Sequence, residues 1–591
     1  MKYCASPYRY QRRETRPVII GDPKNGGVTV GGGKPIVQQS MLTCSTLDTD
    51  ACIEQSMALV DVGCQIVRIT AQTKKYSANL ENILAGIRAR GSNVPVVADI
   101  HFKPDAAMEA VKWCEMVRVN PGNYADSKKF VIREYTDEQY AAELERIEEQ
   151  FTPLVEECKM RGRALRIGTN HGSLSDRIMN RFGDTPLGMV ESALEFAHIA
   201  RKLDFHNFKF SMKSSNPKVM IECYRLLAAR LAEMGPDWNY PLHLGVTEAG
   251  EGEDGRIKSA IGIGSLLCDG FGDTIRVSLT EDSPNEIAVC NDLIAQINEL
   301  ADVGADKFCV GMSYDPFDYQ RRDTPEIELV DNVKCGGEQT IRVVVTQSAW
   351  DKLVPCIKPG DDVKPEAIYE ELNVMEVDPR EEFTVNCDKQ FVSVKDGVVL
   401  PAITAFRLLA GRLKAAGVSN PILLKDCLAF GKTALEPNIA LLRASVVIGS
   451  LLCDGIGDAI LVRGESGAGQ SLRMAYNILQ AAGCRSFKTD YVACPSCGRT
   501  LFDLQEITAR IKARTEHLKG VKIAIMGCIV NGPGEMADAD FGYVGGAPNK
   551  INLYVGREPV RFNIPEEEAV ESLVNLIKEH DKWVEPQPAV A

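Results

Sequence analysis

The stretch Ile66-Val67-Arg68-Ile69-Thr70 is a short apolar run with one arginine inside it, and seven similar runs accompany it in the first half of the chain. Stretches with helical periodicity separate these runs, a pattern typical of βα units around a parallel sheet. Eight such units in about 250 residues predict an α/β fold of the TIM-barrel type. The expected strands are Ile36–Ser40, Ile66–Thr70, Pro95–Asp99, Met116–Val119, Ala164–Gly168, Asn207–Ser211, Pro241–Val246 and Thr274–Ser278.

Basic side chains recur where these strands end. In a TIM barrel all strands open through their C-terminal ends on one face, where active sites are built. Four arginines and a lysine on that face would form a cation cup suited to a phosphate ester, because guanidinium groups bind phosphate oxygens in pairs. Any single arginine is more often part of a surface ion pair, but chance would scatter the set over both barrel ends. The cup consists of Arg68, Arg118, Arg166, Lys213 and Arg276, with Asn120, Asn170, Thr247 and Ser278 beside them.

Two further side chains on this face suit proton transfer. Glu248 is a carboxylate among cations, and it either neutralises a neighbouring arginine or acts as a general acid or base beside the substrate. His101 is either a proton donor or a neutral hydrogen-bonding residue of the wall. Residue type alone leaves both alternatives open.

Three cysteines near the C-terminus, Cys494, Cys497 and Cys528, can meet at one soft metal centre. Cys528 is the last cysteine of the chain, and the Gly-Pro-Gly turn after it is placed to aim Glu535 at the fourth position. Three thiolates and one oxygen suit an iron–sulfur cluster with a replaceable ligand, which can give way to a substrate oxygen. The alternative is a structural zinc site, which usually closes with a second close pair of Cys or His that Cys528 lacks.

The composition is that of a soluble globular protein, with 45% hydrophobic and 25% charged residues. A net charge of −14 disfavours a nucleic-acid or anionic-membrane partner. Most of the nineteen cysteines lie in apolar helical or strand contexts, which indicates reduced thiols in a reducing compartment. We find neither the apolar core of a signal peptide nor a run long enough to span a bilayer, and we expect a cytoplasmic protein.

One segment of the chain is repeated. Gly264–Asp273 returns at Gly449–Asp458 with nine of ten letters identical, so the region from about 300 to 482 should resemble the later part of the barrel. Shared sequence implies shared fold but not shared function. The second copy keeps its packing residues and loses its charges, so we expect it to be catalytically silent. The alignment matches Lys213 with Lys395, Arg276 with Leu461, and Glu248 with Leu428.

Three domains are therefore expected. Residues 1–300 would form a substrate-binding TIM barrel, 301–482 a degenerate barrel-like structural insert, and 483–591 a C-terminal α+β iron–sulfur domain. In the last domain the pattern predicts a helix near Leu504–Leu518, a strand at Lys522–Met526 and a final helix near Glu566–His580.

These motifs together closely resemble the 4-hydroxy-3-methylbut-2-enyl diphosphate synthase family of the deoxyxylulose phosphate route to isoprenoids. The resemblance covers about 35–290 and 485–560, and the insert makes the chain similar to the longer, three-domain members. The matching stretches include Val97-Ala98-Asp99-Ile100-His101-Phe102, Arg118-Val119-Asn120-Pro121-Gly122-Asn123, Arg166-Ile167-Gly168, Thr247-Glu248-Ala249-Gly250, Ala493-Cys494-Pro495-Ser496-Cys497 and Asn531-Gly532-Pro533-Gly534-Glu535.

The resemblance implies an enzyme that uses one 4Fe–4S cluster to open the ring of 2-C-methyl-D-erythritol 2,4-cyclodiphosphate, with ferredoxin or flavodoxin as electron donor. It implies that Cys494, Cys497, Cys528 and Glu535 hold the cluster, and that Glu248, Glu535 and His101 are catalytic. It also implies a substrate-binding set of Arg68, His101, Arg118, Asn120, Arg166, Asn170, Lys213, Thr247, Arg276 and Ser278.

Two other functions stay open at this point. The chain could be a non-redox TIM-barrel transferase with a zinc site at its C-terminus, or its last domain could be an electron carrier that does no chemistry on a substrate. The site also requires that one chain folds back on itself or that two chains pair. We expect one chain to fold back, with the insert as a spacer.

Overall fold

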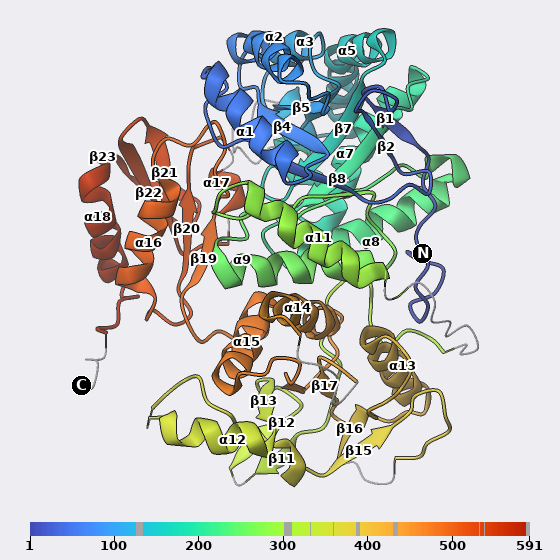
Figure 1. The fold of residues 1–591 in the computed structure, drawn as a ribbon, viewed down its shortest axis with the longest axis vertical. Coiled ribbons are helices and arrows are strands. Elements are labelled where there is room, and N and C mark those ends of the chain that lie inside the picture. The colour runs from blue at the N-terminus through green and yellow to red at the C-terminus, as the bar shows by residue number, and fades with distance from the viewer. Residues whose placement is uncertain are drawn as a thin grey trace.

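The computed structural model describes all residues of the chain except 126–133, 299, 301–309, 331, 359, 386–389, 429–434, 531, 537 and 587–591. Three units are visible in Figure 1: a barrel at the top, a second unit below it, and a C-terminal domain beside the barrel. The expected fold class of a TIM barrel, a barrel-like insert and a C-terminal α+β domain is confirmed.

The first unit is a barrel of eight parallel strands in the order β8-β7-β6-β5-β4-β3-β10-β9, and a bridge between Phe210 and Leu242 joins β8 to β9. All eight expected strands are present. The seventh and eighth pair over only two residues each, because the chain leaves the ladder for the loops that carry Thr247 and Ser278. The strands are β3 (Val37–Met41), β4 (Ile66–Thr70), β5 (Val96–Ile100), β6 (Met116–Val119), β7 (Ala164–Asn170), β8 (Phe208–Lys213), β9 (His243–Leu244) and β10 (Thr274–Ile275).

Helices surround this barrel and bury its outer face in one continuous apolar core. They are α1 (Thr49–Asp61), α2 (Lys74–Ala89), α3 (Pro104–Ala110), α4 (Pro121–Tyr124), α5 (Asp137–Arg161), α6 (Asp176–Phe182), α7 (Pro186–Lys202), α8 (Pro217–Met234), α9 (Gly252–Ser259), η2 (Ala260–Gly264), α10 (Ser265–Cys268) and α11 (Pro284–Asn298).

A hairpin that the sequence patterns did not predict closes the N-terminal end of the barrel. Strands β1 (Val18–Ile20) and β2 (Val28–Val30) pair antiparallel, and their valines and isoleucine pack on the first residues of the barrel strands, such as Ile66 and Met116. With this end closed by apolar side chains, only the C-terminal end of the barrel is available for a site.

The second unit is an open, parallel half-barrel with its own closing hairpin. Its sheets β14-β13-β18-β17 and β15-β16 are joined by a bridge between Val392 and Ile422. The strands are β13 (Arg342–Val345), β14 (Ala367–Ile368), β15 (Val374–Val377), β16 (Phe391–Val394), β17 (Leu423–Lys425) and β18 (Ala459–Leu461). The hairpin is β11 (Ile327–Val330) with β12 (Val333–Cys335), and the helices are α12 (Gln347–Leu353), α13 (Ala402–Ala415), α14 (Pro437–Cys453) and α15 (Ala468–Ala481).

The repeated segments of the two barrels meet in a buried four-residue ion network. Arg225 and Arg407 each form an ion pair with both Asp269 and Asp454, and each of the four contacts is 2.8 Å long. Each arginine therefore binds the aspartate of its own repeat and that of the other, as in a two-fold symmetric interface. The hydroxyl groups of Ser265 and Ser450 also meet, at 2.7 Å. We call Arg225, Arg407, Asp269 and Asp454 the ion quartet.

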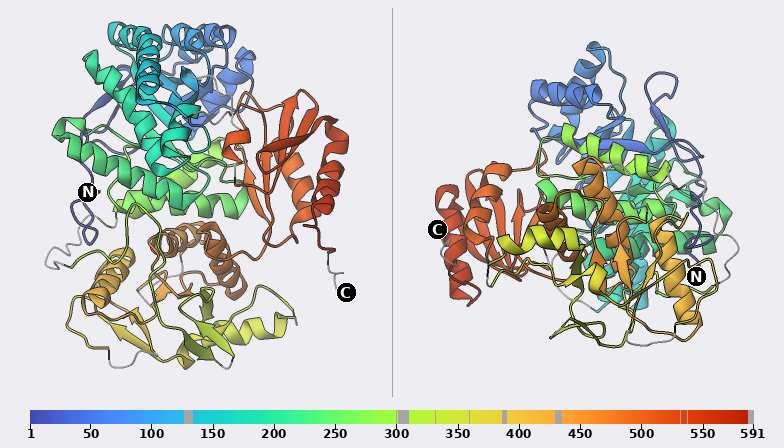
Figure 2. Two further views of the ribbon diagram at one scale, coloured as in Figure 1. Left: turned by 180° about the vertical axis from the view of Figure 1, so that it is seen from behind. Right: turned by 60° about the horizontal axis from the view of Figure 1, so that its bottom comes forward.

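The C-terminal domain is a five-stranded mixed sheet in the order β19-β20-β21-β22-β23. The expected strand and two helices are present, whereas the antiparallel strands β21 to β23 were not predicted. One face packs on α16 and α18, which lie on the outer side, and the other face turns toward the barrel (Figures 1 and 2). The elements are β19 (Asp490–Ala493), α16 (Leu504–Thr515), β20 (Lys522–Met526), α17 (Gly532–Glu535), β21 (Phe541–Ala547), β22 (Lys550–Val555), β23 (Glu558–Pro565) and α18 (Glu566–Glu579).

The chain folds back so that this domain lies against the barrel of the same chain. A bridge joins Ala249, in the loop after β9, to Ala493 at the end of β19. Ion pairs flank the bridge, including Lys258 with Asp490 at 2.9 Å and Lys512 with Glu251 at 2.8 Å. Among the described helices, none is both long and apolar enough to cross a membrane.

Candidate active site

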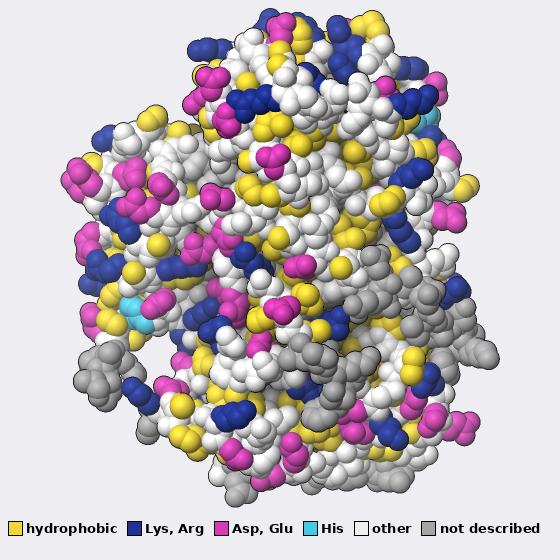
Figure 3. Space-filling model, in the orientation of Figure 1, with side chains coloured by type: hydrophobic (Ala, Val, Ile, Leu, Met, Phe, Trp, Pro, Cys, Tyr) yellow, Lys and Arg dark blue, Asp and Glu magenta, His cyan; other side chains and the backbone are white. Residues whose placement is uncertain are grey.

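The five residues of the cation cup lie inside the first barrel, toward the C-terminal ends of its strands. They come from β4, β6, β7, β8 and the residue after β10, and none is more than 6% exposed. On the face drawn in Figure 3, acidic and basic side chains are interspersed. The positive charge of the cup is therefore concentrated inside the barrel of an otherwise acidic protein.

Asp99, at the end of β5, is the carboxylate around which part of the cup is arranged. Its Oδ1 atom lies 2.9 Å from Arg68 and 3.0 Å from Arg118, and its Oδ2 lies 3.3 Å from His101 Nε2. Burial alone would raise the pKa of this carboxyl, but the neighbouring Arg68, His101 and Arg118 hold it well below the ordinary value. Asp99 is thus ionised and fixes the orientation of the cations around it.

His101 occupies the cup as a neutral ring. Burial lowers its pKa to about 3, and Arg499 and Arg118 add to the effect although Asp99 opposes it. The Nη1 of Arg118 lies 2.8 Å from Nε2, so a neutral ring accepts that hydrogen bond. This geometry favours a hydrogen-bonding role for His101 over the proton-donor role.

Several cup cations lack a counter-ion. Burial lowers the pKa values of Arg166 and Lys213 well below their ordinary range, and neighbouring arginines lower them further. The Nε and Nη1 atoms of Arg166 are buried without a hydrogen-bond partner, as is Nδ2 of Asn120. Buried donors without partners are costly, and an anion bound there would satisfy them. The cup therefore has the properties of an anion site.

Arg276 pairs with a second carboxylate, Glu286, in place of Asp99. Two nitrogens of its guanidinium each lie 3.1 Å from an oxygen of that carboxylate, which Ser40 also contacts at 2.7 Å. The pair leaves Arg276 Nη1 beside Met41. Glu286 was not among the predicted site residues, and it holds the arginine at the edge of the cavity described next.

The cup and the C-terminal domain share one cavity. Barrel residues in its wall include Arg68, Lys213, Arg276 and Ser278, and the C-terminal domain contributes Cys494, Cys497, Cys528 and Glu535. The Cys494 loop is held in place by a hydrogen bond from Thr280 Oγ1 to the Cys494 carbonyl at 3.0 Å. All four predicted cluster ligands thus face the same space as the cations.

Glu248 also lines this cavity. Its backbone adopts a left-handed conformation with φ of 48°, which is unusual for a residue with a side chain, and its Oε2 is buried without a partner. Burial raises the pKa of its carboxyl well above the ordinary value, and the adjacent Glu535 raises it further. A strained backbone is typical of residues at functional sites, so this conformation is consistent with a catalytic role for the Glu248 carboxyl group.

Glu535 is oriented by the barrel. Asn170 donates a hydrogen bond from Nδ2 to Glu535 Oε1, and the oxygen of the same amide accepts a bond from Arg118 at 3.0 Å. Asn170 therefore links the cup to the carboxylate expected to bind the fourth iron, an arrangement typical of residues behind a metal ligand. Asn531, in the same motif, lies outside the described residues.

The donor set fits an iron–sulfur cluster. Burial raises the pKa of the Cys494 thiol well above the ordinary value, and the neighbouring Cys497, Glu248 and Cys528 raise it further. Such a gathering of acidic groups needs a cationic centre to bind them together. Within the described part of the chain, no three Cys, His, Asp or Glu side chains are arranged to hold a single metal ion. Cys494, Cys497, Cys528 and Glu535 line one cavity, and three thiolates with one oxygen are a ligand set that suits an iron–sulfur cluster.

Close backbone contacts seat the C-terminal domain on the barrel. A Cβ atom added to Gly172 would lie 2.0 Å from the carbonyl oxygen of Gly534, and one added to Gly534 would lie 2.3 Å from that of Gly172. Gly498 likewise lies against the backbone of Cys44. The absence of side chains at these positions allows the two domains to approach closely enough to form a shared cavity.

The comparisons with known proteins agree with this geometry. The family model described as the GcpE TIM-barrel domain matches residues 18–291, and the GcpE protein C-terminal domain matches 490–579. The 4-hydroxy-3-methylbut-2-en-1-yl diphosphate synthase (flavodoxin) of Akkermansia muciniphila is 57% identical, with 99% of each chain covered. The chain belongs to the GcpE family.

Two other relatives also align with this chain over nearly its whole length. The flavodoxin-type synthase of Protochlamydia amoebophila is 44% identical over 99% of each chain. The ferredoxin-type chloroplastic synthase of Oryza sativa is 42% identical over 99% of this chain and 89% of its own. The two GcpE models leave residues 292–489 unmatched, yet these relatives align along nearly the whole chain, so the insert is shared with them.

The predicted site residues of this GcpE-family chain fall into two groups. One group lines the cavity: Arg68, Asn170, Lys213, Thr247, Glu248, Arg276, Ser278, Cys494, Cys497, Cys528 and Glu535. The other group is buried without lining it: His101, Arg118, Asn120 and Arg166. The site also contains Asp99, Glu286 and Arg499, which were not predicted as site residues.

The expectation that the insert loses its charges is wrong in part. Lys395, the counterpart of Lys213, is exposed, and Leu461 and Leu428 are buried and apolar. However, Lys425 at the end of β17 is buried and bonds Glu376 and Asp396, at 2.5 and 2.9 Å. Arg463 also pairs with Asp396. The charges of the insert lie at positions near Lys395, Leu428 and Leu461, and they neutralise each other.

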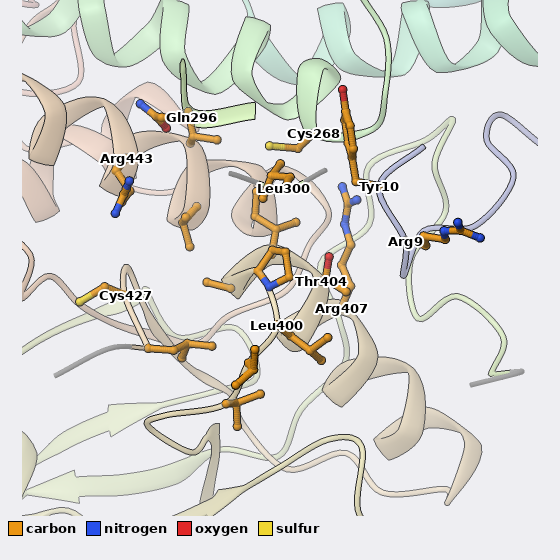
Figure 4. Close-up of a pocket in the computed structure, with 18 of the residues that line it drawn as sticks. Arg9, Tyr10, Cys268, Gln296, Leu300, Leu400, Thr404, Arg407, Cys427 and Arg443 are labelled. Carbon is orange, nitrogen blue, oxygen red and sulfur yellow. The ribbon is translucent and has the colours of Figure 1, made fainter. Parts of the chain in front are cut away.

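A cavity of about 500 Å³ lies between the insert and the first barrel. Its wall is mostly apolar, with residues such as Leu400 and Leu300, and Arg407 in it belongs to the ion quartet. Figure 4 shows Arg9 and Arg443 on opposite sides of the space, with guanidinium groups that do not converge. The wall therefore lacks the concentration of cations found in the first barrel, and catalytic silence of the insert stays a prediction.

Proposed function

We propose that the chain catalyses the reductive ring opening and dehydration of 2-C-methyl-D-erythritol 2,4-cyclodiphosphate to 4-hydroxy-3-methylbut-2-enyl diphosphate. Two electrons and two protons enter, one carbon–oxygen bond to the diphosphate breaks, and one hydroxyl group leaves as water. The observation that carries the proposal is the single cavity in which three cysteines and Glu535 face Arg68, Lys213 and Arg276. Neither a transferase with a remote zinc site nor a free-standing electron carrier would require this arrangement.

The cation cup binds and orients the diphosphate in this proposal. Arg166 and Lys213 have no counter-ion, so an anionic substrate gains charge-assisted hydrogen bonds there. Asp99 and Glu286 keep Arg68, Arg118 and Arg276 in fixed positions before the substrate arrives. Such fixed donors cost little reorganisation when charge develops on the departing diphosphate oxygen.

One 4Fe–4S cluster, held by Cys494, Cys497, Cys528 and Glu535, would supply the electrons one at a time. Asn170 orients Glu535, and Thr247 and Glu248 stand beside the substrate carbons. Glu248, with one carboxyl oxygen buried and unpartnered in the cavity, provides the proton for the leaving hydroxyl. The C-terminal domain covers the barrel mouth and excludes water.

The remaining assignments follow from the same proposal. The electron donor is a flavodoxin or a ferredoxin, the two donor types that the relatives' names print. The working compartment is the cytoplasm. Residues 1–300 bind the substrate, 301–482 serve as a structural spacer, and 483–591 carry the cluster.

Anaerobic purification tests the cofactor. We expect about four iron and four sulfide per chain, and an electron paramagnetic resonance signal from the reduced protein that changes when the cyclic diphosphate is added. Stoichiometric zinc without sulfide would support a transferase instead. A cluster signal that does not change when the cyclic diphosphate is added would support an electron carrier.

The Glu248→Gln variant tests the proton role. We expect it to bind the cyclic diphosphate with the same spectral change and to turn over about 100-fold more slowly, a typical contribution of a general acid. Glu251→Gln is the matched control, because Glu251 lies three residues away and pairs with Lys512 on the surface of the domain contact. Normal turnover by Glu248→Gln would remove the proton role from Glu248.

A further inference from the structure

Arg499 is the one basic side chain that the described part of the C-terminal domain contributes to the cavity wall. It follows Cys497 by two residues and is only 8% exposed. The five cup cations all belong to the barrel, so Arg499 carries positive charge into the site from the opposite domain. Its position therefore depends on how the two domains meet.

The loop that carries Arg499 is fixed against the barrel. Gln72 donates a hydrogen bond to the Gly498 carbonyl at 3.2 Å. A Cβ atom on Gly498 would lie 2.5 Å from the Cys44 carbonyl oxygen and 2.7 Å from Thr70 Oγ1, so only glycine allows this approach. The barrel residues after β3 and β4 thus determine where the Arg499 backbone lies.

The Arg499 side chain stands between acidic groups of both domains. Its Nη2 lies 3.5 Å from Asp99 Oδ2 in the barrel, and it hydrogen-bonds the side chain of Cys497 in its own domain. Cys528 also interacts with it electrostatically. Asp99 already binds Arg68 and Arg118, so Arg499 is the third arginine around one carboxylate. Its Nε has no partner.

We propose that Arg499 is a positioning residue that couples closure of the C-terminal domain to the ease of reducing the cluster. The proposal rests on the proposed function. Reduction adds negative charge to the cluster, and a guanidinium held beside its thiolate ligands stabilises that charge. The barrel holds Arg499 in this place through Asp99 and Gly498 only while the domains are together. Reduction is therefore favoured when the site is closed.

Potentiometric titration of the loaded enzyme, followed by electron paramagnetic resonance, tests this inference. In Arg499→Gln we expect a midpoint potential more negative than in the wild type, with about tenfold less reduced cluster at a fixed applied potential, or ~59 mV for one electron. Arg499→Lys keeps the charge and should recover most of the shift.

Two matched variants show whether the effect is specific. Arg514→Gln removes an exposed pair with Glu571, and Lys512→Gln removes a pair between the domains outside the cavity. Both should leave the potential unchanged. An unchanged potential in Arg499→Gln with a raised KM would overturn the inference and make Arg499 a substrate-binding residue. An equal shift in Lys512→Gln would overturn it too, because general loosening of the domain contact would then suffice.

The cluster content separates this inference from the proposed function. If the wild type holds no iron and sulfide, the proposed function fails and no potential exists to shift. If it holds both and Arg499→Gln and Arg499→Lys keep the wild-type potential, only the inference about Arg499 fails.

Discussion

The first barrel and the insert have similar architectures but differ in how their buried cations are paired with carboxylates. Each has a closing hairpin, parallel strands and a helix with the same Gly-Ser-Leu-Leu-Cys-Asp-Gly sequence. The likeness extends to the segment before each hairpin, where Thr15 and Thr324 bond Asp273 and Asp458 at 2.8 and 2.9 Å. In the first barrel, the buried cations Arg166 and Lys213 form no ion pair with a described residue, whereas in the insert Lys425 and Arg463 pair with carboxylates.

This difference shows what a site requires beyond a fold. A parallel barrel gathers side chains at the C-terminal ends of its strands whether or not they bind a ligand. The insert pairs its charges and so gains stability without a place for an anion. The first barrel keeps charges without partners, at a cost in stability that an anionic ligand would offset. Four predictions test this contrast: one on activity, then three on stability from the largest effect to the smallest.

Arg166→Met should have the largest effect on activity. Arg166 is fully buried behind the cavity wall and two of its nitrogens have no partner among the described residues, so its removal takes positive charge away from the place expected for the diphosphate. We expect kcat/KM to fall about 100-fold, which corresponds to about 2.7 kcal/mol of transition-state stabilisation. The free energy of unfolding should rise by about 1 kcal/mol, because an uncompensated buried charge is gone.

Steady-state kinetics and urea unfolding measure the two effects on the same preparation. A drop in both activity and stability would contradict the contrast, because it would mean that Arg166 holds the barrel together. The iron and sulfide content serves as the control for an intact C-terminal domain.

Arg407→Met should have the largest effect on stability. It removes one member of the ion quartet and leaves Asp269 and Asp454 in an apolar surrounding with a single arginine. Breaking a buried ion network in this way costs about 3–5 kcal/mol. Thermal and urea unfolding check the loss, with Arg412→Met as control, because Arg412 lies on the same helix and bonds the carbonyl of Pro379. Equal losses in the two variants would show that the quartet adds nothing to stability.

Lys425→Met should reduce stability by a smaller amount and leave turnover unchanged. Its partners Glu376 and Asp396 are each about one-third exposed, so water solvates them once the lysine is gone. We expect a loss of about 1–2 kcal/mol in urea unfolding. A variant with normal stability but lower kcat would mean that the insert takes part in catalysis.

The quartet should also give a modest dependence of stability on pH. Burial alone would raise the pKa of Asp269, but Arg225 and Arg407 hold it below the ordinary 3.8. A depressed carboxyl pKa adds stability that is complete above the ordinary value and is lost as pH falls through the folded-state pKa. The difference in unfolding free energy between the wild type and Asp269→Asn should therefore shrink below about pH 4. A difference independent of pH between 3 and 6 would contradict this.

Much of the fold and site followed from local patterns. Apolar runs ending in Arg68, Arg118 and Arg166 predicted the strands and the end at which the cations lie, because a parallel barrel leaves one face for them. The spacing of Cys494, Cys497 and Cys528 predicted three thiols around one space. Both are properties of single segments, and the barrel topology brings the segments together.

What the sequence did not predict depends on contacts between distant segments. Arg499 and Asp99 meet across a separation of 400 residues, and nothing near either one signals the other. The same holds for the ion quartet, whose members lie in both repeats. The hairpin β1–β2 did leave a signal, because Tyr10-Gln11-Arg12-Arg13 before it returns as Tyr319-Gln320-Arg321-Arg322 before β11. The repeat seen at Gly264–Asp273 and Gly449–Asp458 therefore extends to the segments before the two hairpins.

The contact between Gly172 and Gly534 has a practical consequence. A single methyl group at position 534 would act as a wedge at this main-chain contact across the seam, without altering any thiol, carboxylate or arginine. The added methyl group would hold the C-terminal domain slightly away from the barrel, while the side chains of the site stay unchanged. The variant would therefore allow the movement of the C-terminal domain to be studied separately from the reaction in the cavity.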